Sequence, residues 1–346
     1  MKILLFSVLI SSFFLMSCDN KTAVENYNKP LSFGNPENCK NYKGLPQNWL
    51  KQPEAGMVKI SGGTFQIGNN DSYPEERALY KSEREVKAFW MDTTEVTNAQ
   101  FQSFVDATSY VTEAEQQGEA AVFTPPEKQV SELAWWTLTK GAYWKQPWGL
   151  NSTQHIQPNQ PVRMITLKDA MAYADWLGRT LPTEEQWEYA AKGFSQERDV
   201  SADPNHIDAN VWQGEFPYQN ENKDGYPEVA PVGCFTANGF GLHDMIGNVW
   251  EYTSSPFFGT HDDHMGMQQL DIHQTPTFNR YTIKGGSFLC ASNYCMRYRA
   301  SARHPQEIDL GISHVGFKTV KNIKYCNGLK LKTEFHKGKI AKKATL

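Results

Sequence analysis

The short length of its periodic segments constrains the fold of this chain more than any other feature. Apolar residues recur at helical spacing in three stretches, of which the first starts at Thr97, the second covers 167–177 and the third starts at Thr183. Gln100 and Gln186 stand three residues after these two threonines, which is the pattern of a capping box. The 10 Trp, 15 Tyr and 25 Gly are many for a helical bundle, and with these short elements they predict an α+β fold with much irregular structure. The side chains expected to face the core from the second and third helices are Leu167, Ala170, Met171, Ala174, Trp187 and Ala190.

Strand patterns are equally short. Residues 57–68 alternate apolar and polar side chains around Gly62-Gly63, which predicts a strand, a turn and a second strand. Further strands are expected over 85–91, 281–283 and 315–320.

The domain organisation follows from composition and from the absence of a linker. The chain has 346 residues, and its 40% hydrophobic content is sufficient for a core. No linker-like segment interrupts residues 57–322, so one domain is expected rather than two. We place this domain at 51–325, after a tether and N-terminal extension over 18–50 and before a C-terminal tail over 326–346.

The first residues are typical of an export signal. Lys2 precedes an apolar run over 3–16 that is too short to span a bilayer comfortably. The run ends in Leu15-Met16-Ser17-Cys18, which resembles the lipobox of bacterial lipoproteins, although Met16 is bulkier than usual. We expect residues 1–17 to be a lipoprotein signal peptide and Cys18 to be lipidated; an ordinary secretory signal is the alternative. The protein would then be lipid-anchored in the bacterial cell envelope, facing the periplasm or the outer surface.

The balance of charge bears on possible partners. With 34 basic and 38 acidic residues there is no electrostatic case for binding nucleic acid. Contact with a membrane is expected through the lipid anchor only, and the domain is expected to be a monomer.

The remaining cysteines differ in their surroundings. Cys39 and Cys326 flank the two ends of the folded region, and a disulfide between them would close a very long loop. We predict that disulfide. Cys234 has apolar neighbours and is expected to be a buried, inert thiol.

Cys290 and Cys295 are the sharpest local signal. A spacing of five residues brings two side chains together on neither a strand nor a helix, so their sulfurs converge only if a loop or bulge places them. Gly285-Gly286 just upstream permits such a backbone. Convergent thiols in an exported protein indicate a structural disulfide, a redox-active pair or a soft-metal site. Zinc is poorly supported because no second cysteine or histidine pair lies at ligand spacing, whereas Cu(I) accepts few thiolate ligands.

Over about residues 57–320 the sequence resembles the formylglycine-generating enzymes, the sulfatase-modifying oxidases. The resemblance rests on the shared order of several stretches. These are Met57 to Gly68, Phe89-Trp-Met-Asp92, Thr94-Glu-Val-Thr-Asn98, Trp135-Trp136 with Lys140-Gly141, Arg179-Thr-Leu-Pro-Thr-Glu184, Trp187-Glu-Tyr189, Asn210-Val-Trp-Gln-Gly-Glu-Phe-Pro217, Asn238-Gly-Phe-Gly-Leu242, Gly247-Asn-Val-Trp-Glu251, Gly285 to Arg299 and Val315-Gly-Phe317. The resemblance implies a single irregular, loop-rich domain of the C-type-lectin-like kind.

The same resemblance implies an activity. Enzymes of this family use molecular oxygen to oxidise the cysteine of a Cys-x-Pro-x-Arg segment in an unfolded sulfatase to Cα-formylglycine. Cys290 and Cys295 match the pair that holds Cu(I) in the family. Ser287 and Tyr294 match residues beside the copper and oxygen pocket, and Trp250 matches an aromatic wall of it, although a tryptophan is more often a core residue. Arg297 would orient the substrate or have a structural role.

Two calcium sites are also implied by the resemblance. The first comprises the side chains of Asn210 and Asp224 with the carbonyls of Val211 and Tyr226. The second comprises the side chains of Asp244 and Glu251 with the carbonyls of Gly247 and Val249. All are oxygen donors, as a hard cation requires, and the expected role is to stabilise loops.

Some positions depart from the family pattern. Lys318 replaces an arginine that is common after Gly-Phe, and His314 replaces an asparagine. Ala300 and Thr319 stand where some relatives have disulfide cysteines. The histidines and aspartates between His261 and His273 are interpreted as a polar insertion loop rather than a metal site.

Two classes of function stay open on the sequence. The first is the copper-dependent oxidase that acts on an unfolded or nascent sulfatase. The second is a non-catalytic lipoprotein scaffold of the same fold, associated with motility or the envelope. The presence of both cysteines favours the enzyme.

Overall fold

Every sheet in the described part of the protein is small. The computed structural model describes residues 33–80, 82–193, 208–261 and 279–323, and its strands within these ranges form four sheets of two to four strands. The largest sheet has the order β10-β7-β8-β9, and its β10 runs parallel to β7 while the other pairs are antiparallel. Its strands are β7 (Trp250–Pro256), β8 (Arg280–Lys284), β9 (Arg303–Glu307) and β10 (Val315–Gly316).

The other three sheets are smaller, and one of them joins the two ends of the domain through β1 and β11. The three-stranded sheet has the order β1-β4-β11, and β2 with β3 and β5 with β6 form two-stranded sheets. These strands are β1 (Met57–Ile60), β2 (Gly63–Gln66), β3 (Glu83–Val86), β4 (Phe89–Asp92), β5 (Glu119–Phe123), β6 (Trp136–Lys140) and β11 (Val320–Asn322).

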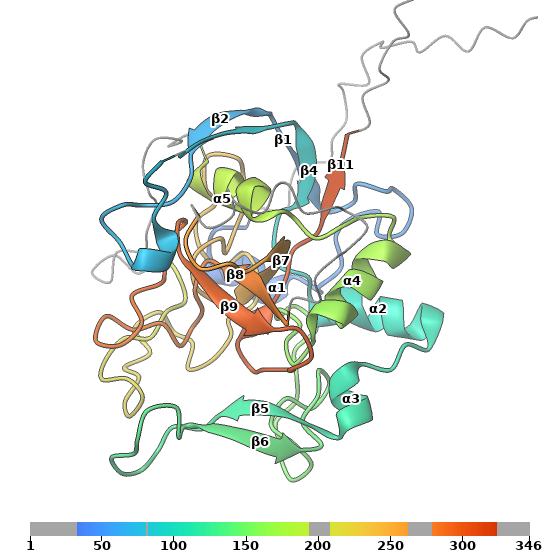
Figure 1. The fold of residues 1–346 in the computed structure, drawn as a ribbon. Helices are drawn as coiled ribbons and strands as arrows, with labels where there is room; N and C mark the ends of the chain where they lie inside the picture. The colour runs from blue at the N-terminus through green and yellow to red at the C-terminus, as the bar shows by residue number, and fades with distance from the viewer. Residues whose placement is uncertain (1–32, 81, 194–207, 262–278, 324–346) are drawn as a thin grey trace, which may run out of the picture. The chain divides into compact units, whose positions relative to one another are not determined.

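Short helices cover these sheets. In Figure 1, α2 and α4 lie side by side, whereas α5 lies beside the sheet of β1 and β4 and contacts β7 and β8. The helices are α1 (Pro36–Asn41), the 3-10 helix η1 (Pro74–Glu76), α2 (Asn98–Thr108), α3 (Glu113–Gln117), α4 (Leu167–Trp176) and α5 (Glu184–Lys192). This combination of few helices, small sheets and long irregular segments confirms the predicted α+β, loop-rich fold class.

Local signals set the helix starts. The capping boxes of Thr97 with Gln100 and Thr183 with Gln186 are both formed, as predicted. Gly193 ends α5 with a positive φ of 58°. Met171, which was expected to face the core, is instead 48% exposed, because the core face of α4 is narrower than its apolar pattern.

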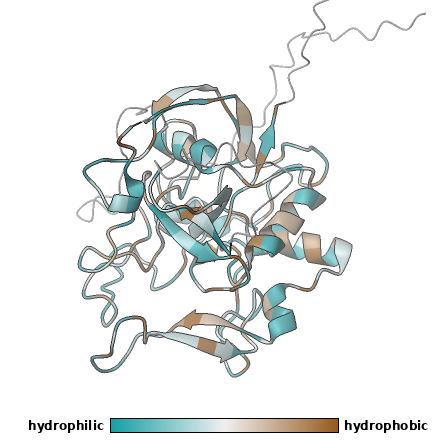
Figure 2. Ribbon diagram, in the orientation of Figure 1, coloured by the Kyte–Doolittle hydropathy of each residue, from teal (hydrophilic) through white to brown (hydrophobic). Residues whose placement is uncertain are grey.

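Two hydrophobic clusters form most of the core. The larger contains the inward faces of α2 and α4 together with Trp250, Phe317 and Cys290. The second contains Trp187 and Ala190 of α5, packed against β1, β2 and β4. Figure 2 shows brown and teal segments on both α2 and α4, as expected for helices that bury one face, whereas β9 is teal along its length.

Three strand predictions were incomplete. The strands expected over 57–68 form as β1 and β2, but β1 pairs with β4 and β2 pairs with β3. The segment 85–91 contains two strands, β3 and β4, and 315–320 is divided between β10 and β11. In each case the partner strand, which is distant in sequence, decides where the strand ends.

The predicted disulfide between Cys39 and Cys326 is wrong. Cys39 is bonded to Cys234, with the two Cα atoms 5.0 Å apart. The expectation that Cys234 is a free thiol is wrong for the same reason. The N-terminal segment runs along the Cys234 loop, where the Gly34 amide donates to the Gly233 carbonyl at 2.9 Å, and sequence order did not reveal this neighbour. Cys326 lies outside the described residues.

The predicted signal peptide and the lipidation site Cys18 also lie outside the described residues, and they stay predictions. Within the part of the chain that the structure describes, no helix is both long enough and apolar enough to cross a bilayer.

Candidate dithiol site and buried carboxylate clusters

Cys290 and Cys295 converge in the loop between β8 and β9. Both are free thiols, and their Sγ atoms lie 3.3 Å apart. A turn brings them together, since the amides of Tyr294 and Cys295 both donate to the Ala291 carbonyl. The positive φ of Gly286 belongs to this backbone, and a Cβ there would stand 2.4 Å from the Arg297 carbonyl oxygen. The loop predicted from the spacing is therefore present, and the two cysteines do not form a disulfide in this structure.

The two sulfurs differ electrostatically. The hydrogen bond from Cys290, assisted by the charge of Arg297, lowers the pKa of Cys295 to about 6 despite its burial. Burial and the neighbouring Cys295 raise the pKa of Cys290. The pair is thus a thiolate at Cys295 that accepts a hydrogen bond from the Cys290 thiol. A thiolate is the metal-binding and nucleophilic form of cysteine, so this donor set fits a soft cation such as Cu(I).

The other predicted residues of this site surround the dithiol loop. Ser287 is fully buried; its carbonyl accepts the Cys290 amide at 2.9 Å, and its Oγ lies 3.4 Å from Nδ1 of His314. Tyr294 is 40% exposed. Trp250 is buried in the same hydrophobic cluster as Cys290, which agrees with its interpretation as a wall or core residue.

Arg297 links the dithiol to an acidic partner. Its Nη1 lies 3.8 Å from Sγ of Cys295, and its guanidinium pairs with Glu75 at 2.6 Å. The guanidinium also lies over the ring of Tyr73, 4.2 Å from the ring centroid. Two partners therefore hold Arg297 in place beside the sulfur.

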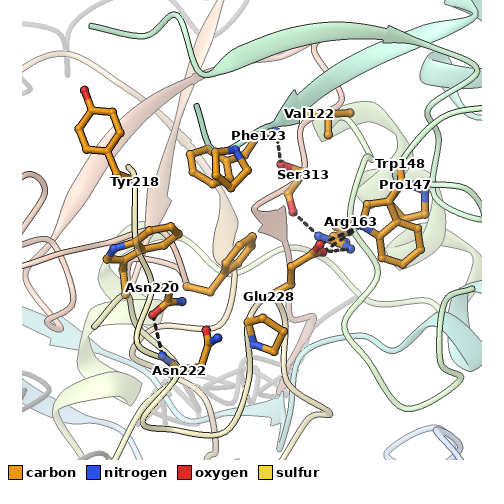
Figure 3. Close-up of a pocket in the computed structure, with 14 residues that line it drawn as sticks. Val122, Phe123, Pro147, Trp148, Arg163, Tyr218, Asn220, Asn222, Glu228 and Ser313 are labelled. Atoms are coloured by element: carbon orange, nitrogen blue, oxygen red, sulfur yellow. Dashed lines mark hydrogen bonds and ion pairs between the residues drawn. The ribbon is translucent and has the colours of Figure 1, made fainter. Parts of the chain in front are cut away.

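A cavity of about 250 Å³ adjoins the dithiol loop. Phe288, two residues before Cys290, lines it together with Phe123 and Trp212, and the Trp212 amide donates to the Cys290 carbonyl at 3.0 Å. Figure 3 shows the opposite wall, where Arg163 pairs with Glu228 at 2.7 Å beside Trp148. The cavity therefore has an aromatic side next to the cysteines and a polar side whose charges are already paired.

The residues predicted for the first calcium site lie close together in sequence and in space. The side-chain amide of Gln213 donates from Nε2 to the Val211 carbonyl and to Oδ2 of Asp224, and so links two of the predicted ligands. Oδ1 of Asn210 is buried without a hydrogen-bond partner. The Tyr226 amide donates to Oδ1 of Asp224 at 2.9 Å. An unpartnered amide oxygen, a carboxylate and a backbone carbonyl are donor types that fit a hard cation.

The second predicted calcium site contains one carboxylate that the sequence did not single out. Glu95 is fully buried, and neither of its carboxylate oxygens has a hydrogen-bond partner. Oδ1 of Asp244 is likewise without a partner. Burial and the charge of Asp244 raise the pKa of Glu95 well above its ordinary value. Glu95 belongs to the stretch Thr94 to Asn98, and a charged residue next to Val96 just before a helix was the available signal.

Lys318 is the cation of this cluster. Its Nζ pairs with Oε1 of Glu251, while Trp187 donates to Oε2 of the same carboxylate at 2.8 Å. Three carboxylates with one ammonium carry a formal charge of two negative units when ionised. One divalent cation would balance this charge, so the donor set fits Ca²⁺ in addition to Lys318.

The backbone segment predicted to complete the second calcium site lies against the first predicted calcium site. Gly247 has a positive φ of 78°, and a Cβ there would stand 2.4 Å from the Asn210 carbonyl oxygen. The Asn248 amide donates to that oxygen at 2.8 Å, and Val249 next to it is buried. The structure therefore brings the two predicted calcium sites together in one region.

A third buried cluster combines the carboxylates of Glu184 and Glu188 with His261, whose ligand atoms lie within 4.8 Å of one another. Three basic side chains pair with these carboxylates. Arg303 pairs with Glu184 at 2.7 Å, and Lys284 and Lys192 pair with Glu188 at 2.8 and 2.9 Å. With cations in excess, the cluster is unsuited to a metal ion. His261 is thus buried rather than part of a polar loop, while His264, Asp271 and His273 lie outside the described residues.

Comparisons with known proteins agree with the predicted family. A family model described as the sulfatase-modifying factor enzyme 1-like domain matches residues 42–323. The formylglycine-generating enzyme of Mycobacterium tuberculosis is 40% identical over 292 residues, which is 76% of this chain and 97% of that protein. A Bos taurus protein named inactive C-alpha-formylglycine-generating enzyme 2 is 36% identical over 236 residues, 63% of this chain and 78% of that protein.

Among solved structures, PvdO from Pseudomonas aeruginosa matches with a TM-score of 0.56 at 20% identity, covering 86% of this chain and 100% of that one, which is a likeness of fold alone. The family model and the sequence relatives go further, because they span most of the chain. The chain therefore belongs to the family of formylglycine-generating, or sulfatase-modifying, proteins, and the predicted family is confirmed.

Proposed function

We propose that this protein oxidises the cysteine of a Cys-x-Pro-x-Arg segment in an unfolded sulfatase to Cα-formylglycine, with molecular oxygen as acceptor. One observation supports this above all. The chain retains two free thiols 3.3 Å apart at the positions that the family resemblance assigns to its metal. The relatives named formylglycine-generating enzyme match along most of the chain.

Cys290 and Cys295 would hold Cu(I), which supplies the exchange of electrons between the substrate thiol and oxygen. Cys295, with its lowered pKa, would bind as a thiolate, and Cys290 would have to lose its proton to become a ligand. Because Arg297 is fixed by Glu75 and Tyr73, its positive charge stabilises the negative charge on the sulfur of Cys295. The aromatic side chains around the loop restrict water at the site.

The alternative is a protein of the same family without catalysis. Family membership alone does not decide between the two, because one relative is named inactive. The paired thiols, the polarised Cys295 and the fixed Arg297 favour the enzyme, because a scaffold would need none of them.

We also propose two structural Ca²⁺ ions. The first would bind the side chains of Asn210 and Asp224 with the Val211 and Tyr226 carbonyls. The second would bind Asp244, with Glu251 and the Gly247 and Val249 carbonyls completing the site and Glu95 as an added ligand. The unpartnered oxygens of Asn210, Glu95 and Asp244 support this assignment, since buried polar atoms without partners are costly.

The test of the oxidase uses the soluble domain without residues 1–18. It is loaded with Cu(I) and mixed in air with a peptide that contains Cys-x-Pro-x-Arg, and mass spectrometry follows conversion of the cysteine to an aldehyde. We expect conversion that requires copper and is lost in Cys290→Ser and in Cys295→Ser, with at least about a hundredfold decrease in rate. Ser292→Ala is the control, since Ser292 is an exposed residue of the same loop. Copper binding without conversion would contradict the proposed substrate, and an absence of copper binding would favour the scaffold.

A further inference from the structure

Two side chains of opposite charge lie near the dithiol loop. Arg297 is 3.8 Å from Sγ of Cys295 and is already paired with Glu75. Glu132 is the second, and its Oε1 lies 3.5 Å from the hydroxyl of Tyr294, the residue that precedes Cys295. A bound segment that carries a positive charge would therefore be repelled from Arg297 and attracted to Glu132.

Aromatic packing fixes the position of Tyr294. Its ring stacks on Phe216, with centroids 4.8 Å apart and planes 12° apart, and meets the edge of Trp135 at 5.4 Å. Phe216 and Trp135 are both buried. Tyr294 itself is 40% exposed, so it presents a fixed aromatic surface to solvent directly beside Cys295.

The connection between β5 and β6 holds Glu132 against this surface. The Ala134 amide donates to the Ser131 carbonyl at 3.1 Å, and the Trp136 amide donates to the Leu133 carbonyl at 3.0 Å. Leu133 adopts a positive φ of 66°, a backbone conformation that residues other than glycine rarely adopt. The turn leaves Glu132 exposed while Trp135 anchors the segment in the aromatic cluster.

Glu132 differs from the other acidic residues near the site in having no basic partner. Glu75 pairs with Arg297, and Glu228 pairs with Arg163. The part of the chain that the structure describes gives Glu132 the hydroxyl of Tyr294 and no ion pair. A carboxylate left unpaired beside an aromatic surface is suited to an incoming guanidinium.

We propose that Glu132, with Tyr294, binds the arginine of the substrate segment and so orients that segment across the dithiol. The inference rests on the proposed function, because the arginine belongs to the Cys-x-Pro-x-Arg substrate. Proline in that segment favours an extended backbone, which advances about 3 Å per residue, so the arginine lies well away from the reacting cysteine. A contact at Glu132, next to the loop rather than at the sulfurs, agrees with that separation.

The experiment measures binding separately from oxidation. Peptides in which serine replaces the reacting cysteine are bound to the protein, and fluorescence anisotropy gives their Kd without copper or oxygen. The peptides have arginine, glutamine or glutamate at the last motif position. The protein variants are Glu132→Gln and Glu132→Lys, with Glu127→Gln as the control, since Glu127 is an exposed carboxylate in the same β5–β6 connection.

We expect Glu132→Gln to raise the Kd of the arginine peptide about fivefold and to leave the Kd of the glutamine peptide unchanged. Glu132→Lys should raise the Kd of the arginine peptide about tenfold or more and lower the Kd of the glutamate peptide. With the oxidisable peptide, the change should appear in KM rather than in kcat, and Glu127→Gln should behave as the unaltered protein.

Two results overturn the inference, and they differ from the result that overturns the proposed function. Equal changes in Kd for the arginine and glutamine peptides would show that Glu132 does not contact the arginine. An unchanged Kd of the arginine peptide in Glu132→Lys would show the same. In both cases the proposed function would stand as long as the unaltered protein oxidised the arginine peptide. If the unaltered protein neither bound nor oxidised the arginine peptide, the proposed function would fail and the inference with it.

Discussion

Two buried charged clusters lie in contact with α5, and they differ in their balance of charge. In the first cluster, Glu251 accepts a hydrogen bond of 2.8 Å from Trp187 of α5. The second cluster contains Glu184 and Glu188 of the helix itself. We call them the calcium cluster, after the ion that we propose binds there, and the cation-rich cluster. The calcium cluster consists of Glu95, Asp244, Glu251 and Lys318, and the cation-rich cluster consists of Glu184, Glu188, Lys192, Lys284, Arg303 and His261.

The comparison shows that a buried set of carboxylates does not by itself define a metal site. In the cation-rich cluster, burial would raise the pKa of Glu184, but the charge of Arg303 holds it at about 2. In the calcium cluster, burial and the charge of Asp244 raise the pKa of Glu95, because Lys318 alone does not compensate three carboxylates. The direction of the pKa shift therefore separates a cluster with an excess of negative charge from one that is already neutralised.

The largest effect is expected from breaking the cation-rich cluster. Lys284 is fully buried and pairs with Glu188, so Lys284→Met leaves a buried carboxylate with one cation fewer. We expect the free energy of unfolding to fall by about 3–5 kcal/mol. Urea denaturation measures it, and Lys168→Met is the matched control, since that lysine is 68% exposed and its solvated pair with Glu113 should contribute little. Similar losses in the two variants would contradict the assigned difference.

The second effect tests the calcium cluster. Calcium at about one hundred times its Kd should stabilise the protein by about 3 kcal/mol, and chelation should remove this stabilisation. Glu95→Gln and Asp244→Asn should each reduce the effect of chelation, because they remove proposed ligands. Asp175→Asn, at an exposed carboxylate, is the control. A melting temperature that does not respond to chelation would exclude structural calcium, and a normal response in Glu95→Gln would remove Glu95 from the site.

The sequence allowed some of these features to be predicted and not others, for a physical reason. The starts of α2 and α5 depend on contacts within four residues, so Thr97 and Thr183 identified them. For Cys290 and Cys295 the spacing indicated that only a loop could bring the sulfurs together, whereas their convergence was implied by the family resemblance.

The features that were missed depend on pairs distant in sequence. Cys39 meets Cys234 across a separation of 195 residues, and Glu95 meets Asp244 only after the fold has formed. No local pattern distinguishes Cys234 from Cys326 as the partner of Cys39. The same holds for Glu132, which becomes a neighbour of Tyr294 across 162 residues.

The smallest effect is a dependence of stability on pH that originates in the cation-rich cluster. Burial lowers the pKa of His261 from its ordinary value of 6.5 to about 4, against the opposing charge of Glu184. Between these two values the unfolded chain binds a proton at this position and the folded chain does not, so the stabilisation present above pH 6.5 is lost as the pH falls towards 4.

This loss amounts to about 1 kcal/mol between pH 7.5 and 5.5. His261→Gln should have a lower but flatter profile, so the difference in free energy of unfolding between it and the unaltered protein should shrink as the pH falls. His155→Gln, at an exposed histidine, should leave the shape of the profile unchanged. Parallel profiles for His261→Gln and the unaltered protein would mean that His261 accepts its proton in the folded state as readily as in the unfolded one. The cation-rich cluster would then tolerate a further positive charge, contrary to the distinction drawn between the two clusters.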